Sequence, residues 1–125
     1  MKAIIIITFL AFTLNMSAQN SLGLTKREAK KHIKSDLGVK FQKGYTSTNT
    51  MYFKFNLGST SLYYYFNNNK VYMIKMFAPI DDDDVYKSLV EKYDYDAAKD
   101  MWYYNNIKVY RYQENYWMVY LLTKR

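Results

Sequence analysis

The chain of 125 residues contains no cysteine, which excludes disulfide bonds, thiolate metal sites and a cysteine nucleophile. It contains one histidine, so a metal site or a catalytic triad that needs two histidines is excluded as well. The sequence also has no glycine-rich phosphate loop, no nucleophile elbow and no His-Glu-x-x-His helix motif. These absences predict a protein that is not an enzyme and that binds no cofactor and no metal.

Apolar and aromatic residues, by contrast, are abundant. Half of the chain is hydrophobic, 19% is aromatic and 15 residues are tyrosine. This composition excludes a wholly disordered chain, because enough apolar surface is available to offset the loss of chain entropy on folding. The length is that of a single domain.

The N-terminus has the layout of an export signal. Lys2 provides a positive start, an uncharged and mostly apolar run extends from Ala3 to Leu14, and Ala18 is a suitable cleavage point. The run is shorter than the about 20 residues needed to span a membrane, and a buried first strand or helix is the alternative. We therefore expect a signal peptide at 1–18 and an exported domain at 19–125, periplasmic or extracellular, with no stable membrane insertion.

A helix is predicted from Thr25 to Leu37. Thr25 and Glu28 form a capping box, in which each side chain bonds a backbone N–H at the start of the helix. Gly38 follows as a residue that ends helices. The apolar stripe consists of Ala29, Ile33 and Leu37. His32 falls outside this stripe, has no evident acidic partner, and is expected to be solvated.

Alternating apolar and polar residues, as in Met51–Leu57, predict strands in the rest of the chain, with turns at Asn67–Asn69 and Asn105–Asn106. A second helix is predicted to start within Asp81–Asp84. Its expected buried stripe consists of Val85, Leu89 and Tyr93, with Tyr86 and Val90 beside them. The expected fold is α+β, with two helices packed on one face of a mainly antiparallel sheet of about six or seven strands. The expected order is one helix, about four strands, one helix and about three strands. The stretch from Tyr64 loosely resembles the stretch from Trp102, which leaves either an internal duplication or chance.

The four aspartates Asp81–Asp84 have two interpretations. Clustered carboxylates are ligands for calcium, but the alternating spacing of a calcium loop is absent. The other interpretation is a helix start, where the helix dipole stabilises negative charge.

A basic patch on the first predicted helix comprises Lys26, Lys30, Lys31 and Lys34. Its expected partners are an anionic envelope surface, an acidic polysaccharide or an acidic protein, while a solvated helix face is the alternative. Nucleic acid is not expected as a partner, because export removes the chain from it.

A tyrosine-rich sheet face is the main candidate for binding. Tyr63 and Tyr65 share one strand face, and so do Tyr110 and Tyr112, with Trp117 close to the same region of the chain. Such rings suit a partner's apolar patch or the faces of sugars, although packing in the core is the alternative. We expect a non-enzymatic module that binds a protein or an envelope component through this face. A carbohydrate-binding or glycan-processing protein is the second possibility.

The segment Gly23–Ala29, with Gly23, Thr25, Glu28 and Ala29, resembles the opening of small exported α+β modules of Gram-negative bacteria. These are the outer-membrane assembly lipoproteins of the SmpA/OmlA type and the beta-lactamase-inhibitor-protein-like domains. The chain differs from the lipoproteins because it lacks a lipidated cysteine, and as a whole it is similar to short exported proteins of no assigned activity. The resemblance implies a sheet face that binds protein partners.

Overall fold

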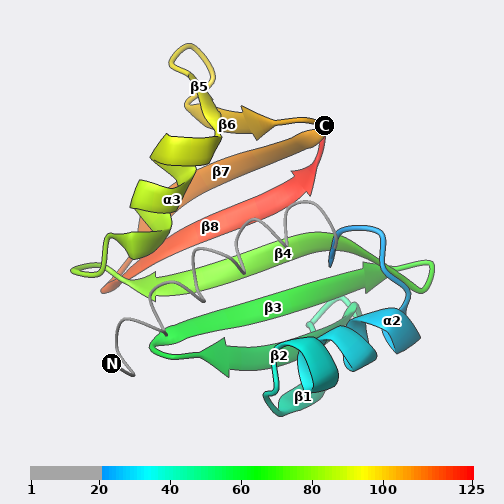
Figure 1. Ribbon diagram of the computed structural model, residues 1–125. Coiled ribbons are helices and arrows are strands. Elements are labelled where there is room, and N and C mark those ends of the chain that lie inside the picture. The colour runs from blue at the N-terminus through cyan, green and yellow to red at the C-terminus, as the bar shows by residue number, and fades with distance from the viewer. Residues whose placement is uncertain (1–20) are drawn as a thin grey trace.

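The computed structural model describes residues 21–125, so the predicted signal peptide and its cleavage site lie outside the described residues. The described part of the chain forms one eight-stranded antiparallel sheet together with two short helices (Figure 1). The strand order is β1-β2-β3-β4-β8-β7-β6-β5, so β4 and β8 meet at the centre. The α+β class and the mainly antiparallel sheet are as predicted.

Each half of the sheet follows a helix. The first half consists of α2 (Lys26–Lys31), β1 (Phe41–Tyr45), β2 (Met51–Leu57), β3 (Thr60–Asn67) and β4 (Lys70–Pro79). The second half consists of α3 (Asp84–Lys92), β5 (Asp94–Asp96), β6 (Met101–Tyr104), β7 (Ile107–Glu114) and β8 (Trp117–Lys124). The predicted order is therefore wrong in its last part, which has four strands. The short strand β5 was missed because its three residues, Asp-Tyr-Asp, are too few to show a pattern.

The first helix begins as predicted. The Thr25 side chain accepts a hydrogen bond from the Glu28 backbone N–H, and the Glu28 carboxylate accepts one from the Thr25 N–H. The helix is shorter than predicted, because a π-helical turn replaces it from His32 to Asp36. Gly38 then takes a φ of 67°, a conformation that costs glycine little.

The second helix begins at Asp84, within the predicted range. Val85 and Leu89 are buried as expected. Val90, which was expected beside the buried stripe, is 55% exposed, because it follows Leu89 and lies about 100° further round the helix. The helix ends at Tyr93, whose backbone N–H bonds the Leu89 carbonyl.

The hydrophobic core lies on one face of the sheet and includes Ala29 and Ile33 of the first helical segment and Val85 and Leu89 of α3. The sheet contributes alternate residues of each long strand, as the burial of β3 illustrates. The predicted two-helix layer fits less well, because the helices are short and most of the chain is strand.

Two-residue turns join the long strands. Asn68 and Asn69 both have positive φ, and so do Asn105 and Asn115 in the later hairpins. Asparagine tolerates this conformation better than most residues. The similar stretches from Tyr64 and Trp102 do not occupy corresponding positions in the two halves. The first lies on the β3–β4 hairpin, which joins the third and fourth strands of its half, and the second lies on the β6–β7 hairpin, which joins the second and third.

Candidate binding face of the sheet

The strand register places tyrosines from both halves of the chain on one side of the sheet. Residues paired directly across antiparallel strands project to the same side. Tyr63 pairs with Lys75. Lys75 pairs with Leu121, and Leu121 pairs with Tyr110. Tyr63 and Tyr110, which lie in different halves, therefore project to the same side.

The other three predicted residues join them. Tyr65 and Tyr112 each lie two residues along a strand from Tyr63 and Tyr110, and side chains alternate along a strand. Trp117 lies two residues before Val119, which pairs with Tyr112. We call this side the open face; its aromatic members are Tyr52, Tyr63, Tyr65, Phe77, Tyr103, Tyr110, Tyr112 and Trp117. In Figure 1 both helices lie in front of the sheet, so the open face is turned away from the viewer.

The rings on the open face pack against one another. Tyr63 and Tyr65 stack with ring centroids 6.0 Å apart and planes inclined by 13°. Tyr52 lies 5.3 Å from Tyr63 and 5.8 Å from Tyr65, and Phe77 lies 5.5 Å from Tyr63. Tyr63 and Tyr65 therefore turn their ring faces towards each other, whereas the contacts with Tyr52 and Phe77 are tilted or edge-on.

The rows of tyrosine hydroxyls affect one another electrostatically. Partial burial raises the pKa of Tyr65 to about 12, and the neighbouring hydroxyls of Tyr63, Tyr52, Tyr72 and Tyr112 add to this effect. Tyr112 belongs to the second half of the chain. The open face is thus one electrostatic environment built by both halves.

Lysines lie among these rings. Lys54 Nζ lies 5.7 Å from the Tyr63 ring centre, and Lys75 Nζ lies 5.2 Å from that of Phe77. Lys108 projects to the same side. It pairs with Thr123, and Thr123 pairs with Met73. Met73 in turn pairs with Tyr65 of the open face. The carboxylates on this side lie at its margin: Asp94 and Asp96 on the outermost strand, and Glu114 at the end of β7. The middle of the open face is therefore positive and aromatic.

The predicted basic patch lies on the other side of the sheet, on the first helical segment. Lys26 is partly buried, and Lys30, Lys31 and Lys34 are exposed. A recess of about 560 Å³ against β1 and β2 is lined by Lys26, Arg27, Lys30, Lys43, Phe41, Met51 and Phe53. The structure thus brings two of the four patch residues, Lys26 and Lys30, to one recess and leaves Lys31 and Lys34 outside its lining.

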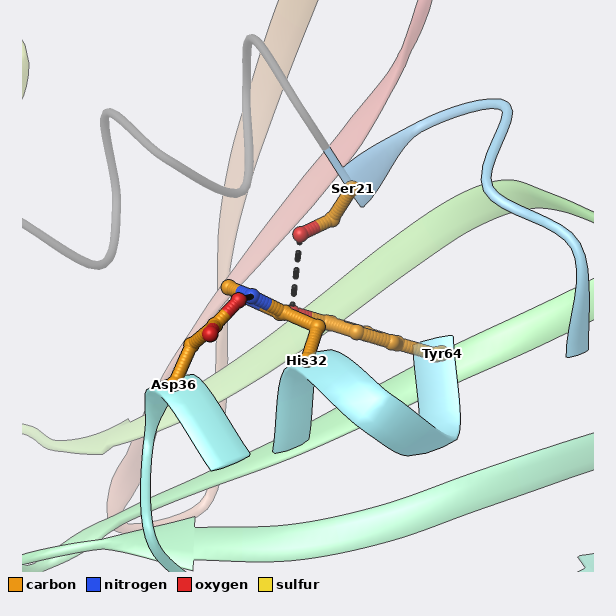
Figure 2. Close-up of polar contacts among 4 residues, drawn as sticks. All are labelled: Ser21, His32, Asp36 and Tyr64. Carbon is orange, nitrogen blue, oxygen red and sulfur yellow. Dashed lines mark hydrogen bonds and ion pairs between the residues drawn. The ribbon is translucent and has the colours of Figure 1, made fainter. Parts of the chain in front are cut away.

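The prediction for His32 is wrong. His32 is only 7% exposed, and its Nδ1 lies 3.0 Å from Asp36 Oδ2 (Figure 2). The spacing of the sequence contains a signal for both the burial of His32 and its contact with Asp36. His32 lies three residues after Ala29, on the flank of the apolar stripe, and Asp36 lies one helical turn further on.

Ser21 and Tyr64 form a second buried pair in the same region, with their hydroxyls 3.0 Å apart (Figure 2). Within residues 21–125, His32 Nε2 has no hydrogen-bond partner. No nucleophile is therefore seen in contact with the histidine, and the cluster forms two separate polar pairs.

The aspartates before α3 form a local turn, and the N-cap residue Asp83 makes no side-chain capping hydrogen bond. The Asp84 backbone N–H bonds Asp82 Oδ1 at 3.0 Å, and Asp83 pairs with Lys87 at 3.5 Å. Burial, and then the charge of Asp82, raise the pKa of Asp84. Carboxylate oxygens of Asp82, Asp83 and Asp84 lie within 4.8 Å of one another, but no second feature among the described residues points to a cation.

Comparison with known proteins adds no assignment. No protein-family model, curated protein or solved structure matches this chain significantly. Among residues 21–125, no helix has the length and apolar character needed to cross a membrane.

Proposed function

We propose that the protein is a non-enzymatic binding module, exported from the cell, that engages an acidic protein partner through the open face. The observation that carries the proposal is the register, which brings Tyr63, Tyr65, Tyr110, Tyr112 and Trp117 to one side of the sheet. Helices α2 and α3 support the sheet from the opposite side. The partner then approaches the side where no described helix intervenes.

The arrangement of the rings favours a protein over a carbohydrate. Stacking on a sugar needs an exposed ring face, whereas Tyr63 and Tyr65 turn their faces towards each other. Tyr110 and Trp117 are 41% and 40% exposed and are available to a partner. Tyrosine and tryptophan at the centre of a surface patch are the residues that contribute most to protein interfaces.

The charge of the open face favours an acidic partner. Lys54, Lys75 and Lys108 lie among the rings, and complementary charge speeds association and selects between partners. Ring and charge contributions can be separated by mutation, because the lysines and the exposed tyrosines alternate across the face.

The test is capture of binding partners from an envelope extract with the purified domain 19–125. Lys75→Glu reverses a charge at the centre of the open face, and Tyr110→Ala removes an exposed ring. Lys31→Glu makes the same charge change on the exposed face of the first helix and is the matched control. We expect a partner that is captured by the wild type and by Lys31→Glu, and that is lost at least tenfold with both open-face variants.

Loss of capture with Lys31→Glu and retention with Lys75→Glu would contradict the proposal and would assign binding to the basic patch. A glycan array separates the carbohydrate alternative, which predicts selective glycan binding that Tyr110→Ala abolishes. Export is tested separately by intact-mass measurement of the protein from its source cells. A chain that begins at Gln19 is expected, and an unprocessed chain would exclude export through this signal.

A further inference from the structure

A cavity in the second half of the molecule lies on the helix side of the sheet, so it is independent of the open face. Its volume is about 360 Å³, which is at the lower end of the range for small-molecule sites. It lies between α3 and strands β5 to β7 and is lined by Tyr86, Val90, Tyr93, Tyr95, Asp100, Trp102 and Arg111. Four of these seven residues are aromatic.

Arg111 is the only cationic residue of this lining. Its guanidinium carbon lies 4.3 Å from the Tyr86 ring centre and 5.4 Å from that of Trp102. The ion pairs of the described residues do not include Arg111. Its charge and a hydrogen bond from it also oppose the rise in the pKa of Tyr120 that burial causes. Within residues 21–125, this planar cation thus lies against two rings and has no carboxylate at ion-pair distance.

Two further tyrosines of the lining carry hydroxyls, one buried at Tyr93 and one at the exposed rim at Tyr95. Tyr93 is 5% exposed, and its hydroxyl has no hydrogen-bond partner within residues 21–125. Burial raises the pKa of Tyr93, so this hydroxyl remains a neutral donor. At the exposed rim, the Tyr95 hydroxyl donates to Asp100 Oδ1 at 2.5 Å.

We propose that this cavity binds a small aromatic carboxylate, with its ring among the rings of the lining next to the exposed Tyr95 and its carboxylate on Arg111. A guanidinium binds a carboxylate through two parallel hydrogen bonds, which suits a planar ligand. A dianion such as phosphate is disfavoured, because Asp100 contributes a negative charge to the same lining. Asp100 instead favours a ligand that also carries an amino group.

The experiment uses fluorescence of the domain 19–125 in a Trp117→Phe background. The chain has two tryptophans, so the remaining emission comes from Trp102 in the cavity wall. The probes are 3-phenylpropionate, L-phenylalanine and phenethylamine, which share a ring and differ in charge. We expect saturable changes with the two carboxylates, and at least tenfold weaker binding of the amine.

Arg111→Gln removes the charge, and Lys40→Gln is the matched control on an exposed residue of the first half. Arg111→Gln should weaken both carboxylates at least tenfold, and Arg111→Lys should restore part of the loss. Thermal unfolding of each variant shows whether a loss of binding is caused by misfolding. If Arg111→Gln does not fold, the affinity of Arg111→Lys is the test. Three results would overturn the proposal: no saturable response of the wild type, equal binding of the amine, or unchanged affinity in a folded Arg111→Gln.

Discussion

Three consecutive tyrosines on β3 show how different the two sides of the sheet are. Tyr64 is fully buried on the helix side, whereas Tyr63 and Tyr65 on either side of it in the sequence are partly exposed on the open face. All three are the same residue type, so the intrinsic β-propensity of tyrosine does not explain the difference in burial. The direction of the side chain, which is set by the register, therefore decides whether a tyrosine stabilises the core or forms a surface.

The two sides also treat the phenol hydroxyl differently. On the helix side the hydroxyl needs a protein partner, which Tyr64 finds in Ser21 and Tyr93 does not find among the described residues. On the open face the hydroxyls can reach water, and their mutual effect shows in the pKa of Tyr65. A buried hydroxyl therefore has a structural cost that a surface hydroxyl does not have.

The largest expected difference between the two sides is in stability. Tyr64→Ala removes a fully buried ring and should lower the free energy of unfolding by about 3–5 kcal/mol. Tyr63→Ala removes only cross-strand contacts at a partly exposed position and should cost about 1 kcal/mol. Urea unfolding of both variants measures these values.

Similar losses at Tyr63 and Tyr64 would contradict the distinction between the two sides. A second contradictory outcome is that Tyr63→Ala and Tyr65→Ala unfold the domain while the molecules that remain folded still bind the partner. These rings would then belong to the core. The binding proposal would then lose its main residues.

The second expected effect is a loss of stability at alkaline pH. The folded-state pKa of Tyr65 is raised to about 12 from the ordinary value of 10.0. Since the raised pKa belongs to the folded state, this contribution is fully present below pH 10 and is lost as the pH rises towards 12. After allowance for partial exposure, it is on the order of 1 to 2 kcal/mol.

Absorbance titration of the phenolates measures this effect. Tyr65→Phe should remove a late-ionising component near pH 12, and its unfolding free energy should fall less steeply between pH 10 and pH 12. Tyr45→Phe is the matched control at an exposed position outside the ring cluster. Loss of an early-ionising component in Tyr65→Phe would contradict the shared environment of the open face.

Local sequence signals predicted much of the fold. The capping box of Thr25, the period-two pattern of Met51–Leu57 and the asparagine turns each act within a few residues, and all appear in the structure. The π-helical turn was not predicted because its residues continue the apolar spacing of a helix, and strand β5 was not predicted because three residues are too few to show alternation. The burial of His32 could have been predicted from the sequence, because His32 lies three residues after Ala29 and therefore next to the apolar stripe.

The candidate sites were predictable to different degrees. Alternation showed that Tyr63 and Tyr65 share a side, but not that Tyr110 lies on the same side, because the central pairing of β4 with β8 joins the halves. The cavity around Arg111 was not predicted at all. Its rings come from α3, β5 and β6, and nothing in their spacing indicates that they meet.

The third expected effect concerns hydroxyls on the helix side. Tyr64→Phe leaves the buried Ser21 hydroxyl without this partner and should cost about 1–2 kcal/mol. Tyr93→Phe removes a hydroxyl that has no partner among the described residues, so it should be neutral or stabilising by up to about 1 kcal/mol. Thermal and urea unfolding measure both. A cost for Tyr93→Phe equal to that of Tyr64→Phe would show that the Tyr93 hydroxyl has a partner in solution.

The smallest expected effect concerns how the rings of the open face are held at its margin. A Cβ on Gly44 would lie 2.5 Å from Cζ and Oη of Tyr52, so the ring occupies the space that the glycine leaves. Gly44→Ala should move this ring at a cost of at most about 1 kcal/mol, since the end of a side chain can rotate away. In a Tyr52→Ser background the same substitution should be neutral or slightly stabilising, because glycine weakens strands. The difference between the two backgrounds is the coupling of Gly44 to Tyr52. A coupling of zero would mean that the Tyr52 ring does not lie over Gly44, and the ring cluster with Tyr63 and Tyr65 would then lack its outer support.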